Sequence, residues 1–261
     1  MTVWEGIVLG LVQGLTEFLP VSSDGHLVLA GALLGVATPG VSVEVALHVA
    51  TLGAVLVVYG RRLAALIVGV LRRRPDDLRL AGLLALGTVP AGVVGLLFKP
   101  LVERAFDSLW MAGAGFLVTG AILWSTRRVR SGDLTAPGAG AAALIGVAQA
   151  LAILPGVSRS GSTVSTALLL RVRPAEAAEF SFLLAVPAIT GAAVLESRHI
   201  AAGLAGIGIV PLAVACAVAF VSGIWAIRVL LALLRRGRFH VFAPYCWGIG
   251  ALTLILALWR R

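Results

Sequence analysis

Charged residues are scarce in this sequence. Only 13% of its 261 residues are charged, whereas 59% are hydrophobic, and the mean hydropathy is +1.02. A water-soluble globular domain carries about twice that share of charge, so a soluble fold is excluded. The composition instead predicts an all-α polytopic membrane protein.

Cysteine is scarce as well. Cys216 and Cys246 both lie within apolar runs, where a free thiol behaves as a small hydrophobic group, so neither a disulfide nor a cysteine metal site is expected. The N-terminus lacks the basic residues and the small-residue cleavage site of a secretory signal, and Glu5 precedes its apolar stretch. We therefore expect no removable signal peptide.

The excess of basic residues has a membrane explanation. A net charge of +9 could suggest nucleic-acid binding, but the arginines stand in short tracts between apolar runs. Such tracts set the orientation of membrane proteins. No nucleic-acid partner is expected.

Six segments approach the length of about 20 apolar residues that a helix needs to cross a bilayer. They are residues 43–59, 80–98, 108–126, 179–195, 206–234 and 241–259. Two other regions, 6–36 and 138–171, each hold two shorter apolar stretches around a polar loop with a proline. We interpret both as re-entrant helix hairpins, because irregular backbone survives in a membrane only when it is buried in protein or lines a wet cavity. The alternative is four kinked or ordinary spanning helices.

The chain repeats itself at an offset of 135 or 136 residues. The loop at 19–26 is echoed at 154–163, and further pairs are Gln13 and Gln149, Pro20 and Pro155, Glu44 and Glu179, Gly113 and Gly248, Gly115 and Gly250, and Trp124 and Trp259. We predict a single membrane domain of two repeats, 1–130 and 138–261, each with a re-entrant hairpin and three transmembrane helices. An odd number of crossings per repeat makes this an inverted-topology repeat.

The distribution of basic residues supports this count. With six crossings, fourteen arginines fall on one side and five basic residues on the other, and Arg159 and Arg228 remain within the membrane. The richer side should be cytoplasmic. Hairpin 6–36 then enters from outside and hairpin 138–171 from the cytoplasm, so their tips meet near the midplane, where a binding site is expected.

The two loops have the residues of an anion site. Each returning half-helix presents its N-terminus to the meeting place, and Arg159 carries a permanently charged fork that matches phosphate or carboxylate oxygens. The alternative for Arg159 is an ion pair with Glu17 or Glu179. Five residues suit helix N-cap positions: Ser22, Ser23, Asp24, Ser158 and Ser160.

One histidine stands beside these hydroxyls. His26 follows Ser23 by three residues, so at a helix start the two share a face. A histidine there can shuttle protons or attack phosphorus itself, and we prefer a catalytic role to simple packing. His48 has Leu183 as its repeat mate, and we assign it to packing.

Three side chains offer oxygen ligands to a hard cation. Gln13 and Glu17 are four residues apart and project from one helix face, and Asp24 is nearby in sequence. Such oxygens suit Mg²⁺ or Ca²⁺. The spacing of Gln13 and Glu17 alone is common by chance.

Three ordered motifs together closely resemble the bacterial undecaprenyl-diphosphate phosphatases of the BacA family. They are QGLTEFLPVSSDGHL at 13–27, PGVSRSGST at 155–163 and EFSFLLAVP at 179–187, and the likeness covers essentially the whole chain. The resemblance implies a hydrolase of the bacterial cytoplasmic membrane that converts undecaprenyl diphosphate to undecaprenyl phosphate and inorganic phosphate. It also implies recycling of this lipid carrier for cell-wall peptidoglycan synthesis, and bacitracin resistance.

The resemblance assigns roles to residues of this chain. Its glutamate-rich motif falls on Gln13 and Glu17, its serine and histidine on Ser23 and His26, and its phosphate-binding motif on Ser158, Arg159 and Thr163. Two positions depart from the family pattern, since Gln13 stands where glutamate is frequent and Asp24 where a small hydroxyl residue is usual. We hypothesise that Asp24 supplies the anionic ligand that Gln13 does not.

In the resulting mechanism, the diphosphate group of the substrate enters from the extracytoplasmic side and binds at the two loops. The lipid tail of the substrate stays in the membrane lipid. Ser23, activated by His26, would attack phosphorus, while His26 itself or water are the alternative nucleophiles. Arg159 would hold the phosphate together with Ser22, Ser158, Ser160 and Thr163.

A second function class stays open, because inverted repeats with paired hairpins also build the substrate sites of transporters. The chain could be a flippase of the polyprenyl phosphate carrier. An acid phosphatase of the lipid-phosphatase superfamily is a weaker alternative, since its lysine-arginine motif is not evident. The Gly-rich stretch 113–115 permits close helix contact, either within the chain or between two copies in a homodimer.

Overall fold

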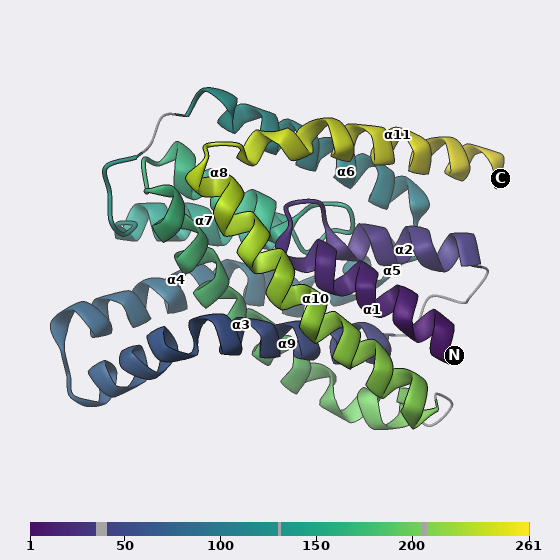
Figure 1. Cartoon of the computed structure of the whole chain (residues 1–261), viewed down its shortest axis with the longest axis horizontal. Helices are drawn as coiled ribbons and strands as arrows, with labels where there is room; N and C mark the ends of the chain where they lie inside the picture. The colour runs from purple at the N-terminus through teal and green to yellow at the C-terminus, as the bar shows by residue number, and fades with distance from the viewer. Residues whose placement is uncertain (35–40, 130–131, 205–207, 261) are drawn as a thin grey trace.

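A computed structural model describes residues 1–34, 41–129, 132–204 and 208–260. The described chain is helical, apart from turns and an isolated β-bridge between Leu134 and Val172. Its helices are α1 (Val3–Phe18), α2 (Ser23–Leu34), α3 (Val41–Leu71), α4 (Pro75–Leu97), α5 (Lys99–Phe106), α6 (Leu109–Ser125), η1 (Thr126–Arg128), α7 (Ala139–Leu151), α8 (Arg159–Leu169), α9 (Pro174–Leu204), α10 (Ile209–Arg235), η2 (Phe239–Phe242) and α11 (Ala243–Trp259) (Figure 1).

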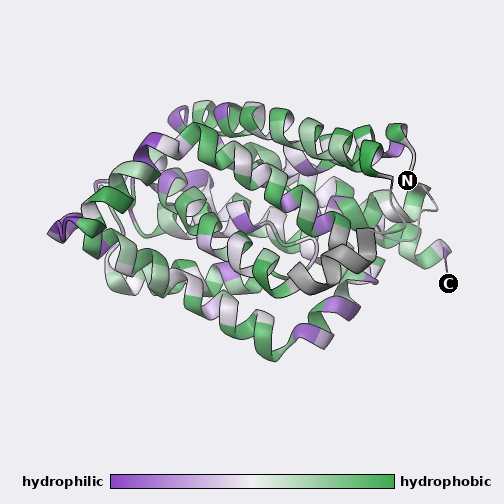
Figure 2. Ribbon diagram, turned by 90° about the horizontal axis from the view of Figure 1, so that it is seen from below, coloured by the Kyte–Doolittle hydropathy of each residue, from purple (hydrophilic) through white to green (hydrophobic). Residues whose placement is uncertain are grey.

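Within the described part of the chain, six helices are long and apolar enough to cross a membrane, and they are the six predicted from the sequence. They are α3, α4, α6, α9, α10 and α11. Figure 2 shows mostly hydrophobic residues along the long helices and a concentration of hydrophilic ones at the end where α3 turns into α4. The chain is a multi-pass membrane protein.

Some boundaries differ from the prediction. Helix α3 continues to Leu71, because Arg61 and Arg62 are good helix formers and residues 63–71 after them are again apolar. Helix α9 starts at Pro174, a residue well suited to a first turn, five residues before the predicted start. The short helix α5 was not predicted, since its eight residues have no apolar run.

Helices α1, α2, α7 and α8 form two hairpins. They contain 16, 12, 13 and 11 residues. At 1.5 Å per residue they reach at most about 24 Å, less than the roughly 30 Å of a hydrocarbon core. The lengths favour re-entrant hairpins over four spanning helices. Figure 1 shows the two tips near the middle of the long helices; residues 35 and 36 of the first predicted hairpin lie outside the described chain.

Glycines let the hairpins and spans approach closely. On α1, a β-carbon at Gly6, Gly10 or Gly14 would meet the backbone of α10. On α6, Gly113 packs against Leu254 and Gly120 against Trp247 of α11. The partner of the Gly-rich stretch thus belongs to the same chain, and a homodimer stays a prediction.

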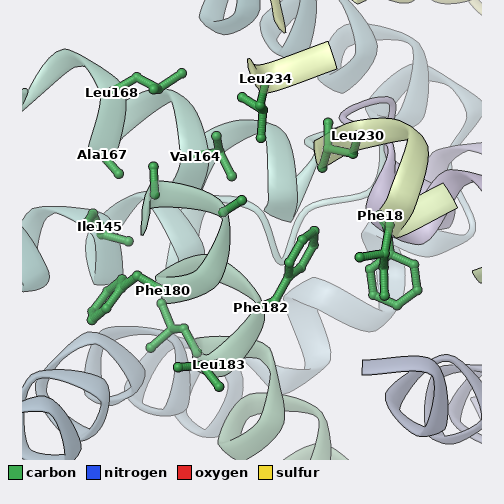
Figure 3. Packing of buried hydrophobic residues seen from close by; sticks show 14 of the residues in the cluster. Phe18, Ile145, Val164, Ala167, Leu168, Phe180, Phe182, Leu183, Leu230 and Leu234 are labelled. Carbon is green, nitrogen blue, oxygen red and sulfur yellow. The ribbon is translucent and has the colours of Figure 1, made fainter. Parts of the chain in front are cut away.

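The hydrophobic core holds the end of the first hairpin helix in place. Phe18, the last residue of α1, is fully buried and meets Phe182 of α9 edge-on, with ring centroids 5.6 Å apart (Figure 3). Leu183 and Leu230 belong to the same cluster. Because Phe18 follows Glu17, this packing also fixes the position of the Glu17 carboxylate.

Candidate active site

The two hairpin tips contact each other through a side-chain hydrogen bond and through close backbone packing. Ser160 Oγ donates a hydrogen bond to the Leu19 carbonyl at 3.3 Å. A β-carbon at Gly25 would lie 2.8 Å from Gly156 Cα, and Gly156 itself has φ +86°, a left-handed conformation that favours glycine. Contact between the tips, which the sequence predicted, is confirmed.

Glu17 is the central residue of the polar cluster between the tips. Its Oε1 pairs with Arg159 Nη2, and its Oε2 accepts hydrogen bonds from Ser23 Oγ at 2.7 Å and from Gln13 Nε2 at 3.1 Å. Glu17 is only 6% exposed. The cluster thus joins a carboxylate, a guanidinium and a hydroxyl from segments 142 residues apart.

The Glu17–Arg159 pair was the alternative interpretation of Arg159, and the structure shows it. Glu179, the other candidate partner, is paired instead with Arg62 at 2.8 Å. That second pair lines a separate cavity of about 290 Å³ between α3, α4 and α9. Arg159 keeps one buried nitrogen, Nη1, without a hydrogen-bond partner.

His48 of α3 also belongs to the cluster. Its Nε2 lies 3.3 Å from Glu17 Oε2 and 3.4 Å from Asp24 Oδ1, and its Nδ1–H donates to the Glu44 carbonyl at 2.8 Å. The assignment of His48 to packing missed this position. A usable signal was present, because an ionisable side chain within an apolar span is a functional candidate by default.

His26 points away from the cluster. Its Nδ1 lies 2.7 Å from the Ser22 carbonyl and its Nε2 lies 2.7 Å from the hydroxyl of Tyr245 on α11. The ring meets Phe116 edge-on at 4.9 Å. Ser23 therefore bonds Glu17, while both ring nitrogens of His26 have other partners.

The hydroxyl groups of the second loop are held by internal hydrogen bonds. Ser158 is the N-cap of α8, as predicted, and its Oγ accepts from Gly161 N at 3.0 Å and lies 3.2 Å from Ser160 Oγ. Thr163 Oγ1 lies 2.6 Å from Ser181 Oγ in the core. In the first loop, Ser22 Oγ accepts from Gly25 N at 3.4 Å and so caps α2.

The oxygens beside Glu17 suit a hard cation. Gln13 Oε1 is buried without a hydrogen-bond partner, and Asp24 Oδ1 accepts no hydrogen bond although His48 Nε2 lies 3.4 Å away. No group of three or more His, Cys, Asp or Glu side chains among the described residues could hold a metal ion. Mg²⁺ does not need such a group, since it commonly takes one or two carboxylates and completes its shell with water and substrate phosphate. Glu17, Asp24 and Gln13 therefore fit such an ion.

Comparison with known proteins gives a consistent result. A family model described as bacitracin resistance protein BacA matches residues 6–252. The chain is similar to the undecaprenyl-diphosphatase of Desulfosudis oleivorans, with 43% identity over 270 residues that cover 97% of this chain and 98% of the relative. It is also similar to the undecaprenyl-diphosphatase of Rhodopirellula baltica, with 43% identity over 97% of each chain. The undecaprenyl-diphosphatase of Desulforapulum autotrophicum is 40% identical over 98% of each chain.

Proposed function

The chain belongs to the bacitracin resistance protein BacA family, and on this premise we propose that it hydrolyses undecaprenyl diphosphate to undecaprenyl phosphate and inorganic phosphate. This reaction recycles the cell-wall lipid carrier and gives resistance to bacitracin. The main support for the proposal is that Ser23 and Arg159 both contact the Glu17 carboxylate between the hairpin tips.

The site can bind an anionic headgroup. Helices α2 and α8 both begin at the tips, so their N-terminal dipoles favour negative charge there. Arg159 Nη1 is an unpaired donor for a phosphate oxygen. The proposed phosphate-binding site is completed by Ser22, Ser158, Ser160 and Thr163. The prenyl tail stays among the helices in membrane lipid.

Ser23 is the proposed nucleophile, and Glu17 is its nearest proton acceptor. As Ser23 Oγ attacks the terminal phosphorus, its proton passes to Glu17 Oε2, 2.7 Å away, and the bond from phosphorus to the bridging oxygen breaks. Undecaprenyl phosphate leaves, and water then hydrolyses the phosphoserine. His26 as nucleophile or base would first have to release Tyr245, and direct attack by water is the third route.

A divalent cation, Mg²⁺ or Ca²⁺, would be held by Glu17, Asp24 and Gln13. It would offset negative charge that develops on the transferred phosphoryl group.

Trapping with labelled substrate separates the three routes. Mapping of the modified residue should identify Ser23, and a labelled histidine would contradict the serine route.

The flippase is the second candidate, supported by the two hairpins that meet at mid-membrane. Purified protein in detergent discriminates between the two functions, because phosphate release needs no second compartment, whereas transport does. Repeated turnover in detergent would leave a pure flippase without support.

The main test is phosphate release from undecaprenyl diphosphate by the wild type and two variants. Arg159→Ala removes a hydrogen-bond donor to the charge that develops on the transferred phosphoryl group. It should therefore lower kcat/KM by at least about 10²-fold. His26→Ala should also lower it by about 10²-fold or more, whichever of the above roles His26 has. Absence of phosphate release by the wild type would contradict the proposed function.

A further inference from the structure

The turn that carries Ser23 is held in an unfavourable backbone conformation. Ser22, the residue before it, has φ +66°, in the left-handed region that residues with a side chain rarely adopt. Such a conformation persists only where surrounding contacts over-determine it. The contacts that hold Ser22 therefore also determine where Ser23 points.

His26 supplies the main contact. The Ser22 carbonyl lies 2.7 Å from His26 Nδ1 and accepts from the His26 backbone N–H at 3.3 Å. A carbonyl oxygen only accepts hydrogen bonds, so Nδ1 carries the ring proton. In the neutral ring, Nε2 is then an acceptor, and its partner is the hydroxyl of Tyr245 at 2.7 Å.

Neighbouring rings lock this arrangement. Phe116 of α6 meets the His26 ring edge-on, and the Tyr245 ring lies parallel to it, with an interplanar angle of 3° and centroids 5.8 Å apart. Tyr245 belongs to α11, whereas His26 belongs to α2. The His26–Tyr245 pair thereby ties a spanning helix to the hairpin tip.

We propose that His26 and Tyr245 are positioning residues that hold the Ser22 turn, so that Ser23 Oγ stays within hydrogen-bond distance of Glu17. We call the chain Ser22–His26–Tyr245 the brace. In this inference, which rests on the proposed function, His26 acts through the backbone of Ser22 and does not exchange a proton with Ser23. Tyr245 acts through His26.

Three substitutions of His26 separate a brace from proton transfer. Asparagine places an amide N–H where Nδ1–H lies, glutamine extends to the place of Nε2, and alanine has neither. A displacement of the nucleophile by about 1 Å can cost about 10²-fold in rate. We expect His26→Asn to retain activity within about tenfold of the wild type, and His26→Gln and His26→Ala to lose about 10²-fold or more, mainly in kcat.

Tyr245→Phe tests the outer half of the brace, with the chain's other tyrosine as its control. Loss of one hydrogen bond should lower kcat by up to about tenfold, with KM nearly unchanged. The ¹⁵N NMR shift of His26 Nε2 should move, because its acceptor hydrogen bond is lost. Tyr59→Phe should change neither; Tyr59 belongs to α3, and its ring packs against Phe182 of α9.

The outcomes are distinct. If the wild type hydrolyses the substrate but His26→Asn is as inactive as His26→Ala, the brace is refuted and His26 takes part in the chemistry directly. An unmoved Nε2 signal in Tyr245→Phe also refutes it. Failure of the wild type to release phosphate concerns the proposed function instead.

Discussion

Glu17 and Arg159 depend on each other for stability as well as for function. Both are largely buried, with side chains 4% and 15% exposed, so each charge needs the other. Removing one partner of a buried pair typically costs about 3–5 kcal/mol, because the remaining charge is uncompensated. We expect Arg159→Ala to lower the free energy of unfolding in detergent by up to that amount, since His48 Nε2 still lies 3.3 Å from Glu17.

The matched control is the double variant Glu17→Gln/Arg159→Ala. Neutralising both partners should recover most of the stability but none of the activity. Thermal unfolding and phosphate release, measured on the same samples, separate the two effects. If the double variant is as unstable as Arg159→Ala, the stabilising partner of Arg159 is not Glu17.

Asp24 allows a test of the charge balance around a cation. If Asp24 supplies the negative charge that Gln13 lacks, Asp24→Asn should raise the Mg²⁺ concentration for half-maximal activity by at least about tenfold, since carboxylates are the main ligands of such ions. A titration of activity with Mg²⁺ measures this. Gln13→Glu in the Asp24→Asn background should restore the original dependence. An unchanged Mg²⁺ dependence in Asp24→Asn would end the compensation hypothesis.

At the residue scale, the sequence predicted which loop residues form the polar cluster better than it predicted the contacts that they make with side chains of the spanning helices. Arg159, Ser23 and Glu17 were expected at one site because their motifs stand at two loops in apolar sequence. His48 and Tyr245 were not, since each comes from a different span and its neighbour depends on how helices are rotated against one another. Hydrophobic pattern determines that a span exists, whereas packing determines its rotation.

At the element scale, α1 depends on its glycines. A β-carbon at Gly10 would lie 3.0 Å from Val218 Cβ and closer still to the Ala215 carbonyl. Gly10→Ala should therefore destabilise the protein by about 1–3 kcal/mol through overpacking. It should also lower activity, because α1 carries Glu17. Thermal unfolding in detergent and phosphate release measure the two effects.

Gly82 on α4 provides the matched control. No atom lies within 4 Å of a β-carbon added there, so Gly82→Ala meets only open space. Alanine is favoured over glycine in a helix by about 0.5–1 kcal/mol. Equal effects of Gly10→Ala and Gly82→Ala on stability would show that α1 is free to move away from α10.

Helix positions were largely predictable, and helix ends were not. All six spans were found because about 20 apolar residues leave a strong signal. The end of α3 was missed by 12 residues, since Arg61 and Arg62 interrupt the apolar run, which resumes at residue 63, while the backbone remains helical. Composition marks where a helix leaves hydrocarbon, whereas hydrogen bonding and capping mark where it ends.

At the scale of the whole molecule, the two hairpins contribute unequal chemistry. At the offset of 135 residues, Asp24 corresponds to Arg159 and Ser23 to Ser158. One tip brings the carboxylates and the proposed nucleophile, and the other brings the guanidinium and a capped helix start. Duplication would thus supply two similar hairpins, and divergence would give them opposite charges that meet around one headgroup.

The arginine tracts predict the orientation of the molecule in the membrane, and this orientation can be measured. Single cysteines at Glu103 on α5 and Asp133 before α7, both exposed, are introduced after replacement of Cys216 and Cys246 by alanine. Because positive residues are retained in the cytoplasm, the side with Arg127 and Arg128 should be internal. An impermeant maleimide should therefore label position 103 in intact cells and position 133 only after permeabilisation. The reverse pattern would place the cytoplasm on the opposite side, and labelling of both positions in intact cells would contradict the six-span arrangement.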